Sequence, residues 1–502
     1  MFTALRIPNY RLWATGALVS NTGTWMQRVA QDWLVLTVLT NNSGVATGVT
    51  TGLQFGPIAL LAPVAGTVAD RVDRRRLLMV TQALSGVLAG VLGVLVVTGT
   101  ARLWHVYVLA GLLGVVAAFD APARHAFVSE MVPPEALSNA VGLNSASFHA
   151  GRLIGPGVAG LLIHWLGTGP VFLLNAVSFG AVLLSLRGMD LRALQPLPRT
   201  LRDPGDTTGT GGTTGAGDTT GIRRYGSVMA GLTYVRRRPD LVLLLSVVGM
   251  VGTFGLNFQL TTALMARTVF DKGAGEYGLL GSIMAIGSLG GALLAARRER
   301  PTPALVVSAT AAFGLASLAA ALMPSYTTFA VALVPVGLSA LTVMTAANAT
   351  VQLSTAPELR GRVMALYGAI FMGGTPVGAP LVGWVGEHFG ARWTILLGGG
   401  VSLATAVVAA AWLIVRDRRA SACSADAEGL REEAVSHEGD DVQEGVRDDE
   451  GHDAARAPEP LPEHDPHHDV PEERPEPLVE VVGPAQERAR HENRAVRPAE
   501  SS

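Results

Sequence analysis

Residues 151–160, GRLIGPGVAG, have a counterpart 223 positions later in residues 374–383, GTPVGAPLVG. The two stretches share glycines at their first, fifth and tenth positions. The correspondence runs without a gap for about sixty residues, starting at Gly114 and Gly337, and long apolar runs surround both copies. Two related helical bundles can rock around a site held between them, so an internal repeat in such a chain predicts a transporter.

The chain has 502 residues, of which 49% are hydrophobic and 16% charged, and its formal net charge is -2. This average joins two different parts. Up to residue 415, apolar runs of about twenty residues dominate, which is the length that crosses a hydrocarbon core. From residue 417 on, the chain is rich in Asp, Glu, Pro, His and Arg and holds more than half of all the acids. We expect a basic membrane body followed by a disordered tail, because such a tail buries too little apolar surface to fold.

The apolar runs predict an all-α polytopic membrane protein with twelve transmembrane helices in two pseudo-symmetric six-helix bundles. The spans must be helical because lipid offers the backbone no hydrogen-bond partners. The predicted spans are 12–38, 46–69, 77–98, 103–121, 141–163, 170–187, 241–266, 277–296, 303–322, 327–349, 362–385 and 393–415. The predicted domains are an N-terminal bundle at 1–187, a linker at 188–240, a C-terminal bundle at 241–416 and an acidic tail at 417–502.

Positive charge alternates between successive loops. One side carries the clusters 71–76, 236–238, 297–300, 360–362 and 416–419, whereas the loops 40–43 and 323–325 on the other side carry none. The positive-inside rule then places both termini in the cytoplasm of a multi-pass protein of the plasma membrane.

The linker contains a run of Gly and Thr at 207–221, which predicts a flexible tether. Residues 223–238, basic at both ends with apolar residues between, fit a short helix on the cytoplasmic membrane face. A basic linker without fixed structure fits the same residues.

The loop after span 2 reads GTVADRVDRRRLL, residues 66–78. It resembles the signature loop of the major facilitator superfamily, G-x-L-A-D-R-x-G-R-[RK]-x-x-L, with Val68 and Asp73 as departures. In that family the glycine permits close helix contact, the aspartate caps a neighbouring helix, and the arginines pair with acids at nearby span ends. The resemblance thus implies a cytoplasmic gate formed by Gly66, Asp70, Arg71 and Arg75, which we expect Asp120 and Arg124 to join.

The stretch 151–160 is similar to the antiporter motif of export branches, G-x-x-x-G-P-x-x-G-G. Gly151, Gly155 and Gly160 would let helix backbones approach, and Pro156 would bend span 5. Tight packing without directional meaning is the alternative. Together with DAPAR (120–124), NAVGLN (139–144) and PELRGRVM (357–364), the chain resembles the enterobactin-exporter-like and macrolide-efflux-like branch over residues 5–415.

The repeat also serves as an internal control for charged residues. Arg152 corresponds to Thr375 in the second copy, so packing is not the whole reason for its charge. An arginine at mid-span costs about 2.5–3.5 kcal/mol and normally faces the bundle interior. Span 1 adds two charged residues four positions apart on one helix face. They are Arg28 and Asp32, with Asn21, Trp25 and Gln31 around them.

We therefore expect a proton-coupling site in the central cavity, in which Asp32 is the protonatable group and Arg152 or Arg28 is its charge partner. A static pair that fixes helix packing is the alternative. In many proton-coupled exporters span 4 carries an arginine four positions before a glycine, where this chain has Ala110 and Gly114. A proton relay built on that arginine is therefore not implied.

These observations favour a secondary transporter, namely a proton-coupled exporter of amphipathic small molecules such as a drug, antibiotic, siderophore or metabolite. An importer of a small metabolite, a membrane sensor that no longer transports and a lipid-moving protein are the alternatives. The sequence shows no nucleotide loop, nucleophile elbow or metal-spaced cluster in the spans, so we expect no enzyme, cofactor or metal site. We expect a monomer whose partners are its substrate, protons and lipid, not nucleic acid.

Overall fold

The computed structural model describes residues 3–194, 231–297, 301–357 and 359–419, which form long helices and no β-strand. The predicted Gly/Thr tether and acidic tail lie outside these residues. Six long helical segments make up the first half. They are α1 (Pro8–Trp33) with its π-helical extension η2 (Leu34–Leu39), α2 (Gly44–Arg71), α3 (Arg74–Val97), α4 (Leu103–Met131), α5 (Pro134–Leu166) and α6 (Thr168–Arg187).

The second half repeats this plan, but its first span is interrupted. That span consists of α8 (Pro239–Met250), the π-helical η5 (Val251–Gly255), α9 (Phe258–Leu264) and the π-helical η6 (Met265–Val269). The remaining helices are α10 (Ala274–Ala296), α11 (Pro303–Ala321), α12 (Tyr326–Ser354), α13 (Arg360–Phe389) and a last helix at Ala391–Arg419. The all-helical fold with twelve long segments confirms the prediction, although α4 and α5 extend well past their predicted apolar spans.

Ten of the twelve segments in the described residues are long and apolar enough to cross a membrane. The other two, α1 and α5, have 26 and 33 residues, so length is not what sets them apart. Both carry charged side chains within their predicted spans, Arg28 and Asp32 in the last two turns of α1 and Arg152 near the middle of α5. Since charge inside a membrane is costly, these helices are the ones expected to face an interior site.

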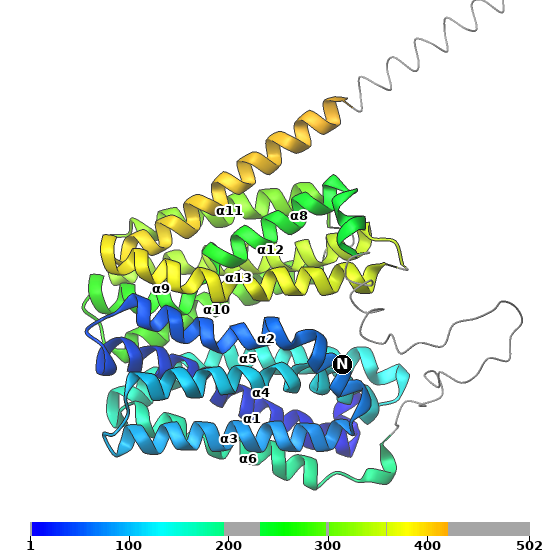
Figure 1. Cartoon of the computed structure of the whole chain (residues 1–502), viewed down its shortest axis with the longest axis vertical. Coiled ribbons are helices and arrows are strands. Elements are labelled where there is room, and N and C mark those ends of the chain that lie inside the picture. The colour runs from blue at the N-terminus through cyan, green and yellow to red at the C-terminus, as the bar shows by residue number, and fades with distance from the viewer. Residues whose placement is uncertain (1–2, 195–230, 298–300, 358, 420–502) are drawn as a thin grey trace, which may run out of the picture. The chain divides into compact units, whose positions relative to one another are not determined.

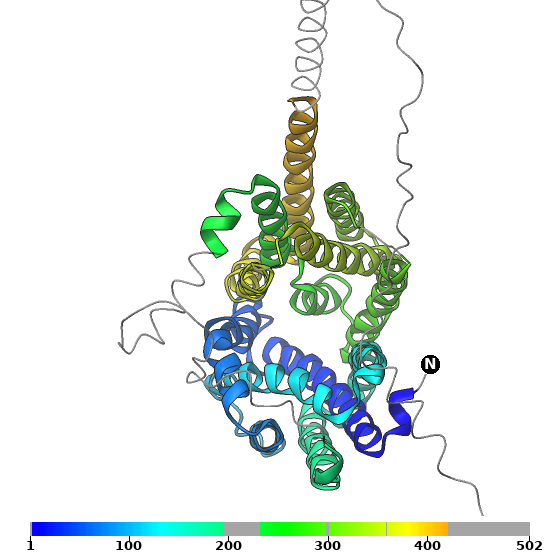
Figure 2. The same ribbon diagram turned by 90° about the vertical axis from the view of Figure 1, so that its right-hand side faces the viewer.

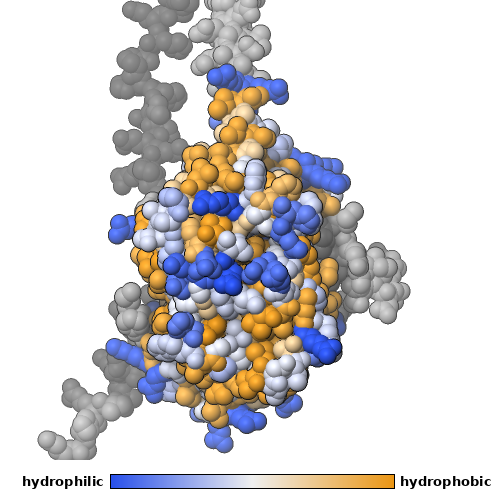
Figure 3. Space-filling model, turned by 90° about the vertical axis from the view of Figure 1, so that its left-hand side faces the viewer, coloured by the Kyte–Doolittle hydropathy of each residue, from blue (hydrophilic) through white to orange (hydrophobic). Residues whose placement is uncertain are grey.

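The helices lie side by side, with those of the first half in one group and those of the second half in another (Figures 1 and 2). The two groups meet mainly through two helix pairs, α2 with α13 and α5 with α10. We call the end of the helices at loop 40–43 the α1–α2 end, and the end at loop 72–73 the α2–α3 end. Figure 3 shows the α1–α2 end, where hydrophilic residues gather across the middle and apolar surface surrounds them.

Equivalent glycines of the sequence repeat occupy equivalent places in the two halves. Gly114 of α4 lies against the backbone of α2, and Gly337 of α12 lies against the backbone of α10. Gly160 of α5 faces α10 across the interface, and Gly383 of α13 faces α2. The pairs α2–α4 and α5–α10 thus correspond to α10–α12 and α13–α2, which confirms the predicted pseudo-symmetry.

The interface between the halves is tightest at the α1–α2 end. A row of glycines on α2 faces α13 there. A Cβ added to Gly44 would lie 2.6 Å from the carbonyl oxygen of Gly383, one on Gly52 would lie 3.0 Å from that of Pro376, and one on Gly56 would meet only the Pro376 ring, at 3.9 Å. A Cβ on Gly66 would meet nothing within 4 Å. The two helices therefore diverge toward the α2–α3 end.

Two hydrogen bonds reinforce the closed end. The Ser43 hydroxyl donates to Oε2 of Glu387 at 2.8 Å, and the Val45 amide donates to the same oxygen at 3.2 Å. Ser43 also caps α2, since its side chain accepts from the Ala46 amide. The first turn of α2 and the last turn of α13 are thus joined by a shared carboxylate.

The basic segment before α8 is helical at 231–236, the part of it that the structure describes. Val235 is only 4% exposed and belongs to the core of the second half. The Tyr234 hydroxyl accepts from the Ala356 amide at 3.4 Å. The described part of this segment therefore packs on protein through Val235, and contact of the segment with the membrane face stays a prediction.

Candidate functional site

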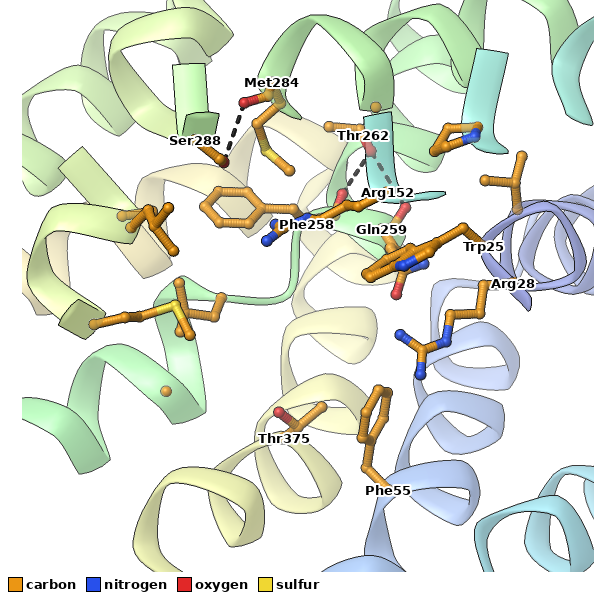
Figure 4. Close-up of a pocket in the computed structure, with 18 of the residues that line it drawn as sticks. Trp25, Arg28, Phe55, Arg152, Phe258, Gln259, Thr262, Met284, Ser288 and Thr375 are labelled. Carbon is orange, nitrogen blue, oxygen red and sulfur yellow. Dashed lines mark hydrogen bonds between the residues drawn. The ribbon is translucent and has the colours of Figure 1, made fainter. Parts of the chain in front are cut away.

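A cavity of about 200 Å³ lies between the two halves (Figure 4). The first half contributes side chains from α1, α2 and α5, and the second half contributes from η5, α9, α10, α12 and α13. Small-molecule sites usually enclose about 300–1,000 Å³, so a drug-sized ligand requires the halves to move apart. The wall is mostly apolar, with Phe55, Phe258, Met284, Met344 and Phe371 among its members.

Two arginines of the first half are the charged groups in the cavity wall. The Arg28 guanidinium lies 4.7 Å from the ring centroid of Trp25 and 5.3 Å from that of Phe55. Figure 4 shows Arg28 reaching between these two rings. The Arg152 guanidinium lies 5.5 Å from the centroid of the same Trp25 ring, so one indole makes cation–π contacts with both arginines. The structure thus brings Trp25, Arg28 and Arg152 together in the wall of the cavity.

Asp32 lies beside the cavity and contacts the opposite half. Its carboxylate is 5% exposed, and Oδ2 is 3.4 Å from the hydroxyl of Tyr277 on α10, which donates to it. The Tyr277 ring, itself part of the cavity wall, stacks on Trp33 with centroids 5.7 Å apart. Asp32 and Tyr277 therefore join α1 of the first half to α10 of the second.

The expected charge partners of Asp32 are not in ion-pair contact with it. The ion pairs within 4.0 Å that the structure records among its described residues include neither Asp32, Arg28 nor Arg152. The Nε atom of Arg28 is buried and has no hydrogen-bond partner. Asp32, Arg28 and Arg152 thus lie in one region of the molecule. Asp32 has a hydrogen-bond partner of its own, whereas Nε of Arg28 has none.

Two further residues expected in the cavity lie elsewhere. The Asn21 amide donates to the Ser147 hydroxyl at 3.1 Å and so ties α1 to α5. Gln31 is 1% exposed, and its Oε1 is buried without a partner. Neither lines the cavity, because both lie on faces of α1 that pack against other helices.

Asp120 and Arg124 form a half-buried cluster within the first half. The guanidinium of Arg124 contacts Oδ2 of Asp120 at 3.0 Å, four residues back on the same helix. The other oxygen of Asp120 accepts from the Thr81 hydroxyl and the Gln82 amide, both at 2.7 Å. Arg124 also lies over the Trp13 ring at 5.3 Å. These contacts join α4 to α3 and α1.

Asp73, one of the departures from the family pattern, organises the start of α3. Asp73 is the N-cap of α3, and its Oδ1 accepts from the Arg76 amide at 2.9 Å. The arginine that pairs with an acid is Arg74, whose partner is Glu130 of α4. Arg75 donates instead to the Leu186 carbonyl oxygen at 2.8 Å. Asp73 thus caps α3, Arg74 pairs with an acid, and Arg75 contacts the end of α6.

The expected close contact at Gly66 is absent from this structure, since the space beside it is empty. Asp70 and Arg71 are exposed at the end of α2. Gly66, Asp70 and Arg71 thus lie at the end of α2 that has separated from α13, whereas Arg75, Asp120 and Arg124 make contacts within the first half.

The three glycines of α5 lie close to the backbones or side chains of neighbouring helices. A Cβ on Gly151 would lie 2.9 Å from the Asn21 backbone, and one on Gly155 would lie 2.7 Å from Cβ of Trp25. A Cβ on Gly160 would lie 2.6 Å from the carbonyl oxygen of Ala274. Pro156 lies inside α5 and lines the cavity. The glycines therefore hold α5 against α1 on one side and against α10 on the other.

The interrupted seventh span is a feature that sequence reasoning missed. Leu256 and Asn257 leave the helix between η5 and α9, at the wall of the cavity. The Asn257 side chain donates to the Thr253 carbonyl oxygen at 2.7 Å, which satisfies one group freed by the break. Glycines at 249, 252 and 255 were the available signal.

Among the described residues, no three His, Cys, Asp or Glu side chains gather into a group that could hold a metal ion. His464, His467 and His468 lie outside those residues. The arrangement of the cavity is that of a binding site: it can hold a molecule by charge, aromatic faces and apolar surface.

Two family models match separate parts of the chain. Residues 1–198 match the model described as "Transmembrane secretion effector", and residues 274–458 match the one described as "Major Facilitator Superfamily". The chain is similar to the multidrug efflux pump Tap of Mycolicibacterium fortuitum, with 27% identity over 76% of this chain and 90% of the pump. It is also similar to the macrolide efflux protein A of Streptococcus pyogenes, with 24% identity over 80% of this chain and 94% of that protein.

The fold is similar to the crystal structure of a bacterial homologue of the human lysosomal transporter Spinster in an inward-facing and unoccupied conformation. The TM-score is 0.62 at 16% identity, and the match covers 82% of this chain and 97% of the other. The two related bundles, the cavity between them and these likenesses agree. The chain belongs to the major facilitator superfamily and is an efflux-type transporter of small molecules.

Proposed function

We propose that this transporter expels amphipathic small molecules from the cell in exchange for protons. It works as a monomer in the plasma membrane, with both termini in the cytoplasm. The observation that carries the proposal is the cavity between the halves, in which charged and apolar surfaces meet and beside which a buried carboxylate contacts the opposite half. The relatives named as efflux proteins support export as the direction.

The contact between Asp32 and Tyr277 supports proton coupling. An ionised carboxylate only accepts hydrogen bonds, whereas a protonated one also donates. The free energy of the contact between the halves therefore depends on whether Asp32 carries its proton. A buried ionised carboxylate is costly when its partners leave. Separation of Tyr277 from Asp32 thus favours uptake of a proton, which links proton binding to movement of the halves.

The driving force is large enough for this exchange. One elementary charge that moves across 100 mV supplies about 2.3 kcal/mol. Since about 1.4 kcal/mol corresponds to a tenfold ratio, one proton can maintain a substrate gradient of tens-fold. Export coupled to one proton therefore needs no second source of energy.

The distribution of positive charge supports the proposed orientation. Arginines cluster in the loops of the α2–α3 end, whereas the loops 40–43 and 323–325 of the other end carry no positive charge. Positive loops stay in the cytoplasm during insertion. The closed α1–α2 end then faces the outside of the cell.

We expect Asp32→Asn to abolish proton-driven export. The change keeps the shape of the side chain but removes its ability to ionise. The measurement is uptake of a dye and antibiotic panel into inside-out vesicles with an imposed pH gradient, with and without an uncoupler. Asp271→Asn makes the same chemical change at an exposed site, with its side chain 94% accessible, and should leave transport intact.

Full uncoupler-sensitive uptake by the Asp32→Asn variant would contradict the assignment of Asp32. The same assay separates the rival functions. Uptake in the opposite direction would favour an importer, and saturable binding without flux in proteoliposomes would favour a sensor.

A further inference from the structure

Two cations share one corner of the cavity, although they come from different helices. Arg28 of α1 and Arg152 of α5 both lie over the Trp25 ring, at 4.7 and 5.5 Å from its centroid. Gly151 and Gly155 bring α5 against the turn of α1 that carries Trp25, so the packing of the helices fixes this juxtaposition. Like charges repel strongly in a medium of low dielectric constant. The fold therefore maintains an arrangement that is unfavourable unless something else binds there.

No acid among the described residues forms an ion pair with either of these two cations. The recorded ion pairs exclude both, and no hydrogen bond to either guanidinium is recorded, although Arg28 Nε is buried. Asp32, four residues from Arg28 on the same helix, attracts Arg28 without contacting it, and its Oδ2 accepts a hydrogen bond from Tyr277. Arg152 on α5 adds a second positive charge to the same corner. An arginine side chain does not lose its proton in proteins, so it cannot relieve the repulsion that way. The corner is thus a cationic site with unused donors.

The rest of the wall has a different character. Phe258, Met284, Met344 and Phe371 present aromatic rings and thioethers, which adapt to apolar molecules of varied shape. The cavity therefore has a charged corner formed by the first half and an apolar wall formed by the second.

We propose that the transported molecule is an amphipathic anion. Its carboxylate, sulfonate or phosphate group accepts hydrogen bonds from Arg28 and Arg152, and its apolar part lies against the wall of the second half. Guanidinium groups suit this task because their planar donors match such anions. The proposal rests on the export function above and narrows its substrate class. A soluble organic acid and an anionic lipid headgroup share this chemistry.

A matched pair of probes tests the charge requirement. The dyes 1-anilinonaphthalene-8-sulfonate and N-phenyl-1-naphthylamine have the same aromatic rings and differ by the sulfonate. Binding of each is measured by fluorescence with the full chain in phosphatidylcholine nanodiscs, after subtraction of empty discs. We expect the sulfonate to bind about tenfold or more tightly than the neutral dye, as charged hydrogen bonds imply.

Variants locate the effect. Arg28→Gln and Arg152→Gln should each weaken the sulfonate about tenfold while the neutral dye changes by less than about twofold. Arg28→Lys should restore part of the affinity, because it keeps the charge but not the planar donors. Arg267→Gln removes a positive charge outside the cavity, where Arg267 pairs with Asp271, and should change neither dye. The wild-type preference between the dyes needs no variant and stands if a variant misfolds.

Three results would overturn the proposal: equal or tighter binding of the neutral dye, no binding of either dye, or an effect of the cavity variants no larger than that of Arg267→Gln. Phosphatidylglycerol in the discs distinguishes the two sources of anion. Loss of sulfonate binding there shows that a lipid headgroup takes the site, and unchanged binding shows that a soluble anion does. The export proposal can fail while the anion-site proposal stands. This would be the result if the sulfonate dye binds to the cavity but is not transported across the membrane. Conversely, export of neutral dyes that is insensitive to both arginines refutes the anion site alone.

Discussion

Asp73 replaces the second glycine of the loop pattern that residues 66–78 otherwise resemble, and the structure gives a physical reason. The aspartate is the N-cap of α3 and accepts from the Arg76 amide at 2.9 Å. A helix start has orphan amides that need acceptors, and a carboxylate also suits the positive end of the helix dipole. A glycine leaves the same amides to solvent. The departure therefore strengthens the start of α3 without lengthening the loop.

Loss of this cap should be visible locally. We expect Asp73→Ala to destabilise the first turn of α3 by about 1 kcal/mol, whereas Asp73→Asn keeps an acceptor and changes little. Hydrogen–deuterium exchange of the amides at 74–77 should then be about fivefold faster in the alanine variant. Equal exchange in both variants would show that the cap contributes nothing to the helix start.

Individual charges were the part of the site that the sequence could reveal. Arg28 and Arg152 stand out because a charge within an apolar helix is expensive and needs a purpose. Tyr277, Met284 and Phe371 could not be found this way, since such residues occur on any face of a membrane helix. Only the packing of the second half decides which of them reach the cavity.

At the scale of single helices, α2 carries information that sequence analysis did not use. Gly44, Gly48, Gly52 and Gly56 are four apart, which is the spacing that lets two membrane helices touch. The structure puts this row against α13, in near contact at Gly44 and apart at Gly56. Helix length was the weaker prediction: α4 and α5 continue past their apolar stretches, because hydropathy detects only what is buried in lipid.

The glycine row predicts a graded response to one added methyl group. Gly48→Ala would push a Cβ into the backbone of α13 at Ala379, whereas the Cβ of Gly56→Ala would have 3.9 Å of clearance. Overpacking costs about 1–3 kcal/mol. We expect Gly48→Ala to disfavour closure of the α1–α2 end and to slow export about tenfold. Gly56→Ala should transport normally. Equal rates for the two variants, measured in inside-out vesicles, would argue against closure through this row.

For the whole molecule, most of the fold could be predicted from the repeat in the sequence. Glycines at 114, 151, 155 and 160 recur in the second half and make equivalent helix contacts there. The sequence repeat therefore corresponds to a pseudo-two-fold relation between the two bundles. The break in the seventh span and the divergence of α2 from α13 did not follow from the repeat. Both depend on differences between the halves, and a pattern of similarities does not encode differences.

A transporter that alternates between two openings must break the contacts of its closed end in each cycle. The contact between Ser43 of the first half and Glu387 of the second is one of these. We replace Cys423 by serine, introduce cysteines at positions 43 and 387, and apply a short membrane-impermeant bis-methanethiosulfonate to intact cells. The cross-link should form from outside and stop export, and a reducing agent should restore it. The halves could then no longer separate at this end.

Cysteines at positions 325 and 328 provide the matched control, because Ser325 and Thr328 have hydroxyl oxygens 2.9 Å apart within the second half alone. Their cross-link constrains one helix start and should leave export unchanged. Continued export with the cross-link between 43 and 387 in place would refute alternation at this end. A cross-link that forms only after the cells are opened would reverse the orientation. One reagent therefore tests two conclusions in the same cells. Loss of export tests whether the halves separate at this end, and cross-linking in intact cells tests whether this end faces the outside.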